Sequence, residues 1–185
     1  MPGFFYDGDS TKLGEWPAFS AFASAVALAN NKSLLSIVNT SSTNLVRIRE
    51  LWIENDQTAA ITGVIAQLNL LRITGHSNGT SITVCLNDTT ETLDSGVSVR
   101  TGSTVSGEDS VVCRQWKVST DEWGVGAQDV ESLQQVFQQA MPRYSGSFNS
   151  RPITLRQNQG ITVKNITNTT AGTFNLFLVF TVEPV

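Results

Sequence analysis

Side chains that could carry out catalysis or bind a metal ion are few in this sequence. The chain has a single histidine, His76, and two cysteines, Cys85 and Cys113. Zinc sites use clustered histidine, cysteine and carboxylate ligands, often with a Cys-x-x-Cys spacing that these two cysteines lack. The sequence therefore predicts no metal site and no bound cofactor.

A serine–histidine–aspartate triad would have to use His76. This residue lies in the segment Gly-His-Ser-Asn-Gly over residues 75–79, which is typical of a turn at a strand end. No Gly-x-Ser-x-Gly nucleophile elbow is present. We expect His76 to pack or form hydrogen bonds at an interface, with a hydrolase that uses it as a base kept as an alternative.

An acidic and aromatic cluster is formed by Asp121, Glu122 and Trp123. A glycosidase needs two carboxyl groups that face each other across ~5–9.5 Å. Adjacent residues point in different directions, so we favour a turn anchored by Trp123 over a catalytic pair. Stacking of Trp123 or Trp116 on a sugar keeps a glycan-binding module open. We assign no catalytic residue.

The composition limits which partners the protein can bind and in which compartment it is made. The net charge is -4 and the pI is about 4.9, which argues against binding a nucleic-acid backbone. No run approaches the ~20 apolar residues of a membrane span, and the N-terminus lacks a signal-peptide pattern. We therefore expect synthesis in a cytoplasm, free buried thiols at Cys85 and Cys113 rather than a disulfide, and no glycosylation.

Alternation of apolar and polar residues predicts a mainly β fold. Charged residues make up 15% of the chain, below the usual ~25%, and the many threonines, serines and asparagines favour strands joined by turns. A slip in the alternation near Glu50 indicates a bulge. The predicted strands are 34–38, 45–53, 62–74, 82–86, 97–101, 111–118, 153–155, 161–166 and 174–182, and the last has the composition of a central core strand.

One short helix is expected over residues 129–141. Asp129 can cap it, an apolar stripe follows at helical spacing, and Pro142 ends it. Many short strands with one inserted helix predict a jelly-roll-like antiparallel β-sandwich over residues 31–185. Residues 1–30 are expected to be an N-terminal arm, although residues 19–29 also fit a helix or a strand.

Several segments resemble, in their order along the chain, small structural proteins of tailed bacteriophages. Together they cover roughly residues 30 to 185. They are Leu51-Trp52-Ile53, residues 57–64, 71–76, 99–107, 119–124, Pro152-Ile153-Thr154-Leu155-Arg156, residues 160–164 and 169–174.

This resemblance implies a virion component of the capsid decoration (cement) protein type, with a jelly-roll-like fold. Such a protein would be assembled in the host cytoplasm and bind the capsid surface through the major capsid protein and through its own copies, as a homotrimer. It would need no cofactor, nucleic acid or membrane. The residues expected to contact partners are Phe4, Phe5, Tyr6, Trp16, His76 and Trp123. A glycan-binding tail or fibre-associated sandwich is the alternative.

Overall fold

The computed structural model describes residues 16–57, 65–120, 143–145 and 152–185 of the chain. These residues form antiparallel β-sheets, and no helix occurs among them. The mainly β prediction is confirmed. The helix predicted over residues 129–141 lies outside the described residues.

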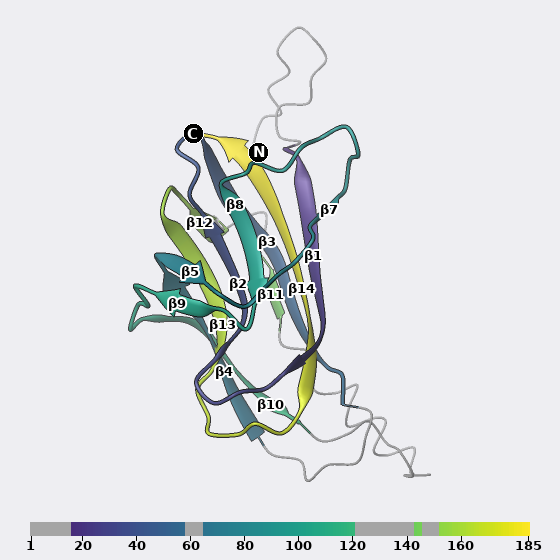
Figure 1. Cartoon of the computed structure of the whole chain (residues 1–185), viewed down its shortest axis with the longest axis vertical. Coiled ribbons are helices and arrows are strands. Elements are labelled where there is room, and N and C mark those ends of the chain that lie inside the picture. The colour runs from purple at the N-terminus through teal and green to yellow at the C-terminus, as the bar shows by residue number, and fades with distance from the viewer. Residues whose placement is uncertain (1–15, 58–64, 121–142, 146–151) are drawn as a thin grey trace, which may run out of the picture.

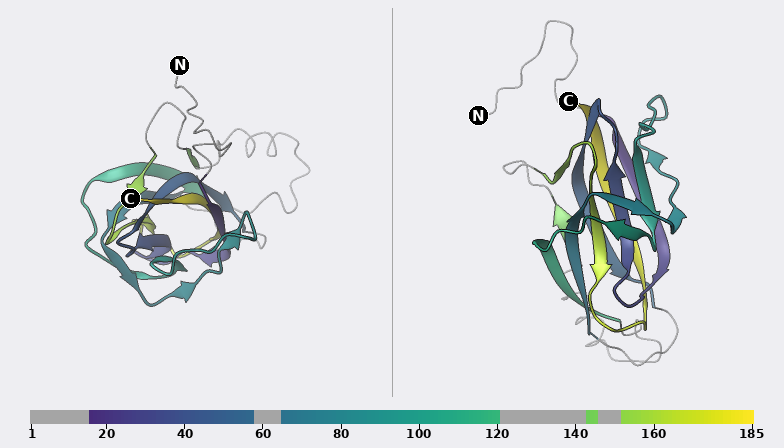
Figure 2. Two further views of the ribbon diagram at one scale, coloured as in Figure 1. Left: turned by 90° about the horizontal axis from the view of Figure 1, so that it is seen from above. Right: turned by 60° about the vertical axis from the view of Figure 1, so that its left-hand side comes forward.

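Two sheets face each other as a β-sandwich (Figures 1 and 2). In the first sheet the strand order is β11-β3-β14-β1-β7, and β12 also pairs with β3. We call it the β14 sheet. Its strands are β1 (Ala18–Ala27), β3 (Asn44–Asn55), β7 (Cys85–Leu86), β11 (Arg143–Ser145), β12 (Thr154–Leu155) and β14 (Thr173–Pro184).

The second sheet has the order β10-β4-β13-β2-β8-β6, and we call it the β2 sheet. Its strands are β2 (Ser33–Asn39), β4 (Ile65–Ile73), β6 (Thr80–Ser81), β8 (Val97–Thr101), β10 (Val112–Ser119) and β13 (Gln159–Asn165). A separate two-stranded ribbon pairs β5 (Gly75–Ser77) with β9 (Thr104–Ser106).

Strand β14 is the central strand of its sheet, as its composition predicted. It lies between β3 and β1, and alternate side chains from Phe174 to Phe180 are buried. Phe180 stacks on Phe19 of β1 with ring centroids 5.6 Å apart. Each buried apolar side chain of this size contributes about 1.5–3 kcal/mol relative to an exposed one, so this strand is a main source of stability.

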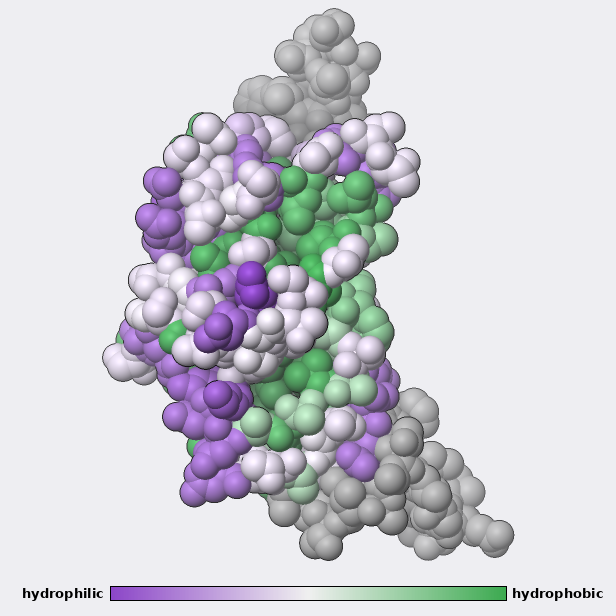
Figure 3. All heavy atoms as spheres, viewed as in Figure 1, coloured by the Kyte–Doolittle hydropathy of each residue, from purple (hydrophilic) through white to green (hydrophobic). Residues whose placement is uncertain are grey.

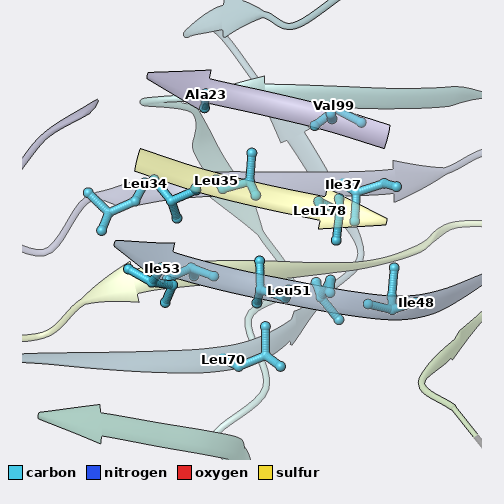
Figure 4. Packing of buried hydrophobic residues seen from close by; sticks show 14 of the residues in the cluster. Ala23, Leu34, Leu35, Ile37, Ile48, Leu51, Ile53, Leu70, Val99 and Leu178 are labelled. Atoms are coloured by element: carbon cyan, nitrogen blue, oxygen red, sulfur yellow. The ribbon is translucent and has the colours of Figure 1, made fainter. Parts of the chain in front are cut away.

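The core lies between the two sheets. Figure 4 shows Ala23, Leu51 and Leu178 of the β14 sheet packing towards Leu35 and Ile37 of β2 and Leu70 of β4. All of these side chains belong to one cluster of buried apolar residues. The inward-facing positions follow the period of two that the sequence predicted.

The bulge predicted near Glu50 is confirmed. Val179 pairs with Glu50, but the next residue, Phe180, pairs with Ile48, so Arg49 is the extra residue in β3. A bulge of this kind lets the buried residues on either side of it keep facing the core although the sequence alternation slips.

Residues 18–27, which were expected to belong to the N-terminal arm over residues 1–30, form a strand of the sandwich. Residues 18–27 form β1, which pairs with β14 along most of its length and places Phe19, Ala21 and Ala23 in the core. The sequence did not distinguish a strand from a helix here because both faces of β1 are uncharged. The alternation of apolar and polar residues that marks a strand is therefore weak. Residues 1–15 lie outside the described part.

Both cysteines are free, as expected. The expectation that both are buried was wrong, because Cys85 is exposed and Cys113 is half-buried. Cys85 lies on β7, an edge strand of two residues at which the predicted strand 82–86 is shortened.

Candidate partner-binding surfaces

Of the residues expected to contact partners, the structure describes two. Trp16 is 41% exposed and lies two residues before β1. The next residue is Pro17, whose carbonyl accepts a hydrogen bond from the Val182 amide. Trp16 therefore lies at the end of the sandwich that also holds the C-terminus. Phe4, Phe5, Tyr6 and Trp123 lie outside the described residues.

His76 lies in strand β5 rather than in a turn, and it is half-buried. Its Nδ1 atom is 2.8 Å from Oγ of Ser36, and its Nε2 atom is 2.7 Å from Oγ of Ser98. The two serines belong to β2 and β8, so the ring connects the ribbon to two strands of the β2 sheet.

The environment of His76 favours the neutral ring. Burial, and then the positive charge of Arg100, lower the pKa of His76 from 6.5 to about 4. In a serine–histidine–aspartate triad a carboxylate holds one ring nitrogen. Here serine hydroxyls bind both nitrogens, so the geometry is that of a structural hydrogen-bond bridge.

The described residues include no group of three or more His, Cys, Asp or Glu side chains that could hold a metal ion. The Asp121 and Glu122 pair lies in the undescribed residues 121–142. Trp116, the other tryptophan considered for glycan stacking, is half-buried and packs against the core. Trp116 therefore does not offer a fully exposed ring, and Trp123 lies outside the described residues.

The sequence did not indicate the aromatic row on the outer face of the β14 sheet. Phe22 of β1 pairs in register with Phe177 of β14, and Phe177 pairs with Trp52 of β3. Phe22 is 55% exposed, whereas Trp52 and Phe177 are half-buried and their rings lie 5.6 Å apart. We call these three residues the aromatic row.

The surface around the aromatic row is also uncharged on the β1 side. The outward positions of β1 from residue 18 to 24 alternate between small side chains and Phe22, and β1 contains no charged residue. The next outward position on β14 is Val179, and Ser20 pairs with the exposed Cys85 of β7. An antiparallel sheet that faced only water would carry more strongly polar residues at these positions. The outward residues of β1 are Ala18, Ser20, Phe22 and Ser24.

A second apolar area closes the open side of the sandwich between β8 and β7 (Figure 3). The connection from β6 to β8 crosses there, and its apolar side chains are half-buried against the core. They are Ile82, Val84, Leu86 and Leu93. Because these residues already have an intramolecular role, this area is a weaker candidate for partner binding than the aromatic row.

The aromatic row could have been found only from the strand register. Phe22, Phe177 and Trp52 are far apart in the sequence, and only the pairing of β1, β14 and β3 places them in one line. The one signal in the sequence was the lack of charge between residues 16 and 31.

No helix in the described part of the chain is long and apolar enough to cross a membrane. Comparisons of the chain with protein-family models, with curated proteins and with solved structures gave no match.

Proposed function

We propose that this protein is a structural component of a bacteriophage virion that binds the outside of the capsid and stabilises it. It would act through contacts with the major capsid protein and with its own copies. The single observation that carries the proposal is the aromatic row, with its uncharged surroundings on β1 and β14. Exposed apolar surface with large aromatic side chains is typical of a protein–protein contact.

We further propose that the sandwich is a jelly roll. Its strand order supports this. In one sheet β1 and β3 lie on either side of β14, and in the other β2 and β4 lie on either side of β13. Strands β1 to β4 thus alternate between the two sheets, as do β12, β13 and β14, which is typical of the double Greek key of a jelly roll. A rigid sandwich of this kind can present a sheet face without a cofactor.

On a symmetric shell many copies bind at equivalent positions. Neighbouring copies that also contact each other gain avidity, so each single contact can be modest. The homotrimer is the proposed assembly because decoration proteins commonly occupy threefold sites, and the proposed location is the capsid surface.

The test is a binding experiment with undecorated capsids and purified protein. We expect saturable binding at a fixed number of copies per capsid and a higher temperature of capsid disruption. Phe22→Ser should weaken binding at least ~10-fold, because a buried aromatic contact is worth more than ~1.4 kcal/mol.

Ile65→Ser is the matched control. Ile65 is 61% exposed, close to the exposure of Phe22, but it lies at the start of β4 in the other sheet. It should leave capsid binding unchanged. Absence of saturable binding by the unmodified protein would refute the capsid proposal, and equal losses in both variants would refute the role of the aromatic row.

A further inference from the structure

The β5–β9 ribbon lies over the outer face of β2 in the β2 sheet. All seven residues of β2 are buried, although only alternate residues can face the β14 sheet. The ribbon contacts β2 at Ser36, whose Oγ atom is 2.8 Å from Nδ1 of His76. It is joined to the end of β4 by Thr74, whose amide donates to the carbonyl of Ser106 at 2.9 Å. The ribbon is a separate two-stranded sheet and does not belong to either sheet of the sandwich (Figure 1).

A chain of hydroxyl groups runs from His76 into the sheet. Oγ of Ser36, which contacts the histidine, is 2.7 Å from Oγ of Ser103. Ser103 donates to Ser33 at 3.3 Å, and Ser33 is 2.7 Å from Oγ1 of Thr162. Thr162 donates to the carbonyl oxygen of Leu35 at 3.2 Å.

The direction in which these hydroxyl groups donate their hydrogen bonds determines the histidine tautomer. Each hydroxyl has one proton to donate, and the Leu35 carbonyl at the far end can only accept. Thr162 donates to that carbonyl and Ser103 donates to Ser33, so Ser33 must donate to Thr162. Ser36 then directs its proton to Ser103, or to the carbonyl oxygen of Arg100 at 3.5 Å, and not to the histidine. Ser36 therefore accepts from His76, which places the ring proton on Nδ1 and leaves Nε2 to accept from Ser98.

Protonation of Nε2 would turn the ring into a cation at this position. Among the residues that the structure describes, no carboxylate is bonded to either nitrogen. The strands β2, β6 and β9 contribute no charged residue, and β8 contributes Arg100, whose charge opposes a second positive charge. On β13, Lys164 is paired with Glu108, so that carboxylate is already bound to a cation.

We infer that His76 is an acid-sensitive latch: the neutral ring holds the β5–β9 ribbon on the β2 sheet, and protonation releases the ribbon while the sandwich stays folded. The ribbon is a small separate sheet of three-residue strands, whereas the cationic ring gains full hydration once it leaves the site. Release would uncover the hydroxyl-lined outer face of β2 around Ser36. This inference does not depend on the capsid proposal.

The first test uses the fact that His76 is the only histidine. Imidazole ¹⁵N shifts of the unmodified protein report both tautomer and titration without a substitution. We expect the Nδ1–H tautomer at pH 7 and a midpoint near pH 4. An Nε2–H tautomer, or a midpoint near 6.5, would overturn the inference.

The second test is amide hydrogen exchange at each residue between pH 7 and pH 3. Protection of ribbon amides such as Thr74 should fall by up to about 10-fold per pH unit as the pH falls from 6.5 to about 4, and it should level off below that. Amides of β14 should keep their protection. In His76→Gln, whose side chain forms hydrogen bonds but does not titrate, ribbon protection should not depend on pH. Asp88→Asn removes an exposed carboxylate elsewhere and should behave like the unmodified protein.

Loss of protection in the ribbon and in β14 together would mean global unfolding and would contradict the latch. The same pH dependence in His76→Gln as in the unmodified protein would also contradict it. Should His76→Gln not fold, the ring titration and the two classes of amide in the unmodified protein still decide the outcome.

Discussion

The carboxylate of Glu183 near the end of β14 allows a sharp test of how the β14 sheet is stabilised. Its side chain is 7% exposed and is bonded to two arginines of β3. Oε2 accepts from Nε of Arg47 at 2.6 Å, and Oε1 accepts from Nη2 of Arg49 at 3.0 Å. Glu183→Gln keeps the volume of this side chain and removes its charge.

The expected loss follows from the exposure of the partners. Removing one partner of a fully buried ion pair costs about 3–5 kcal/mol, whereas exposed pairs are worth about 0–1 kcal/mol. The side chains of Arg47 and Arg49 are 29% and 38% exposed, so water compensates part of their charge. We therefore expect the free energy of unfolding to fall by about 2 kcal/mol, between these limits.

Urea denaturation at pH 7 measures this loss. For a domain of this size, with an m value of about 2 kcal/mol/M, the midpoint should fall by about 1 M. The control is Glu54→Gln, which removes an exposed carboxylate from the same sheet, on β3, and should change the midpoint by less than ~0.3 M. An unchanged midpoint for Glu183→Gln, or equal shifts in both variants, would refute the reasoning.

Three further predictions concern stability. Because the pKa of His76 is about 4 in the folded state against 6.5 unfolded, the unfolded chain binds more protons between these values. The stability contributed by the neutral ring is thus complete above pH 6.5 and is lost as the pH falls to 4. The loss should be about 1–2 kcal/mol after allowance for the partial exposure of the ring. Denaturation midpoints measured over this pH range should show a step that the His76→Gln variant lacks. Ala25 has a φ of 51°, so Ala25→Gly should stabilise the protein by about 0.5 kcal/mol in thermal melts. The control is Ser24→Gly, which should destabilise the protein in the same melts. Ser24 is a neighbouring exposed residue of β1 that has no positive φ. Leu178→Ala should cost about 2–5 kcal/mol because this side chain is 1% exposed; a loss below ~1 kcal/mol would contradict its place in the core.

Strand prediction succeeded where one face of a strand is polar or where the apolar run is short and bounded by turns. Strand β8 matches the predicted range 97–101, and β3 was located together with its bulge at Glu50. The central place of β14 could be predicted because a strand flanked by others in the middle of a sheet needs few polar residues.

Prediction failed where local pattern holds no information about partners. The residues near Phe22 do not indicate that β1 pairs with β14, because the two segments are far apart in the sequence. The serines around His76 also come from separate strands. Their assembly depends on register between strands, which a single sequence does not specify.

The position of β14 also bears on how the protein folds as it is made. β14 lies between β3 and β1, but the ribosome synthesises it after every other described strand. Until it emerges, β1 and β3 have no common neighbour, and their apolar faces stay exposed. We expect the β14 sheet to close only after β14 has been synthesised, at the slow rate typical of folds dominated by long-range contacts, so the nascent chain depends on protection from aggregation until β14 is in place.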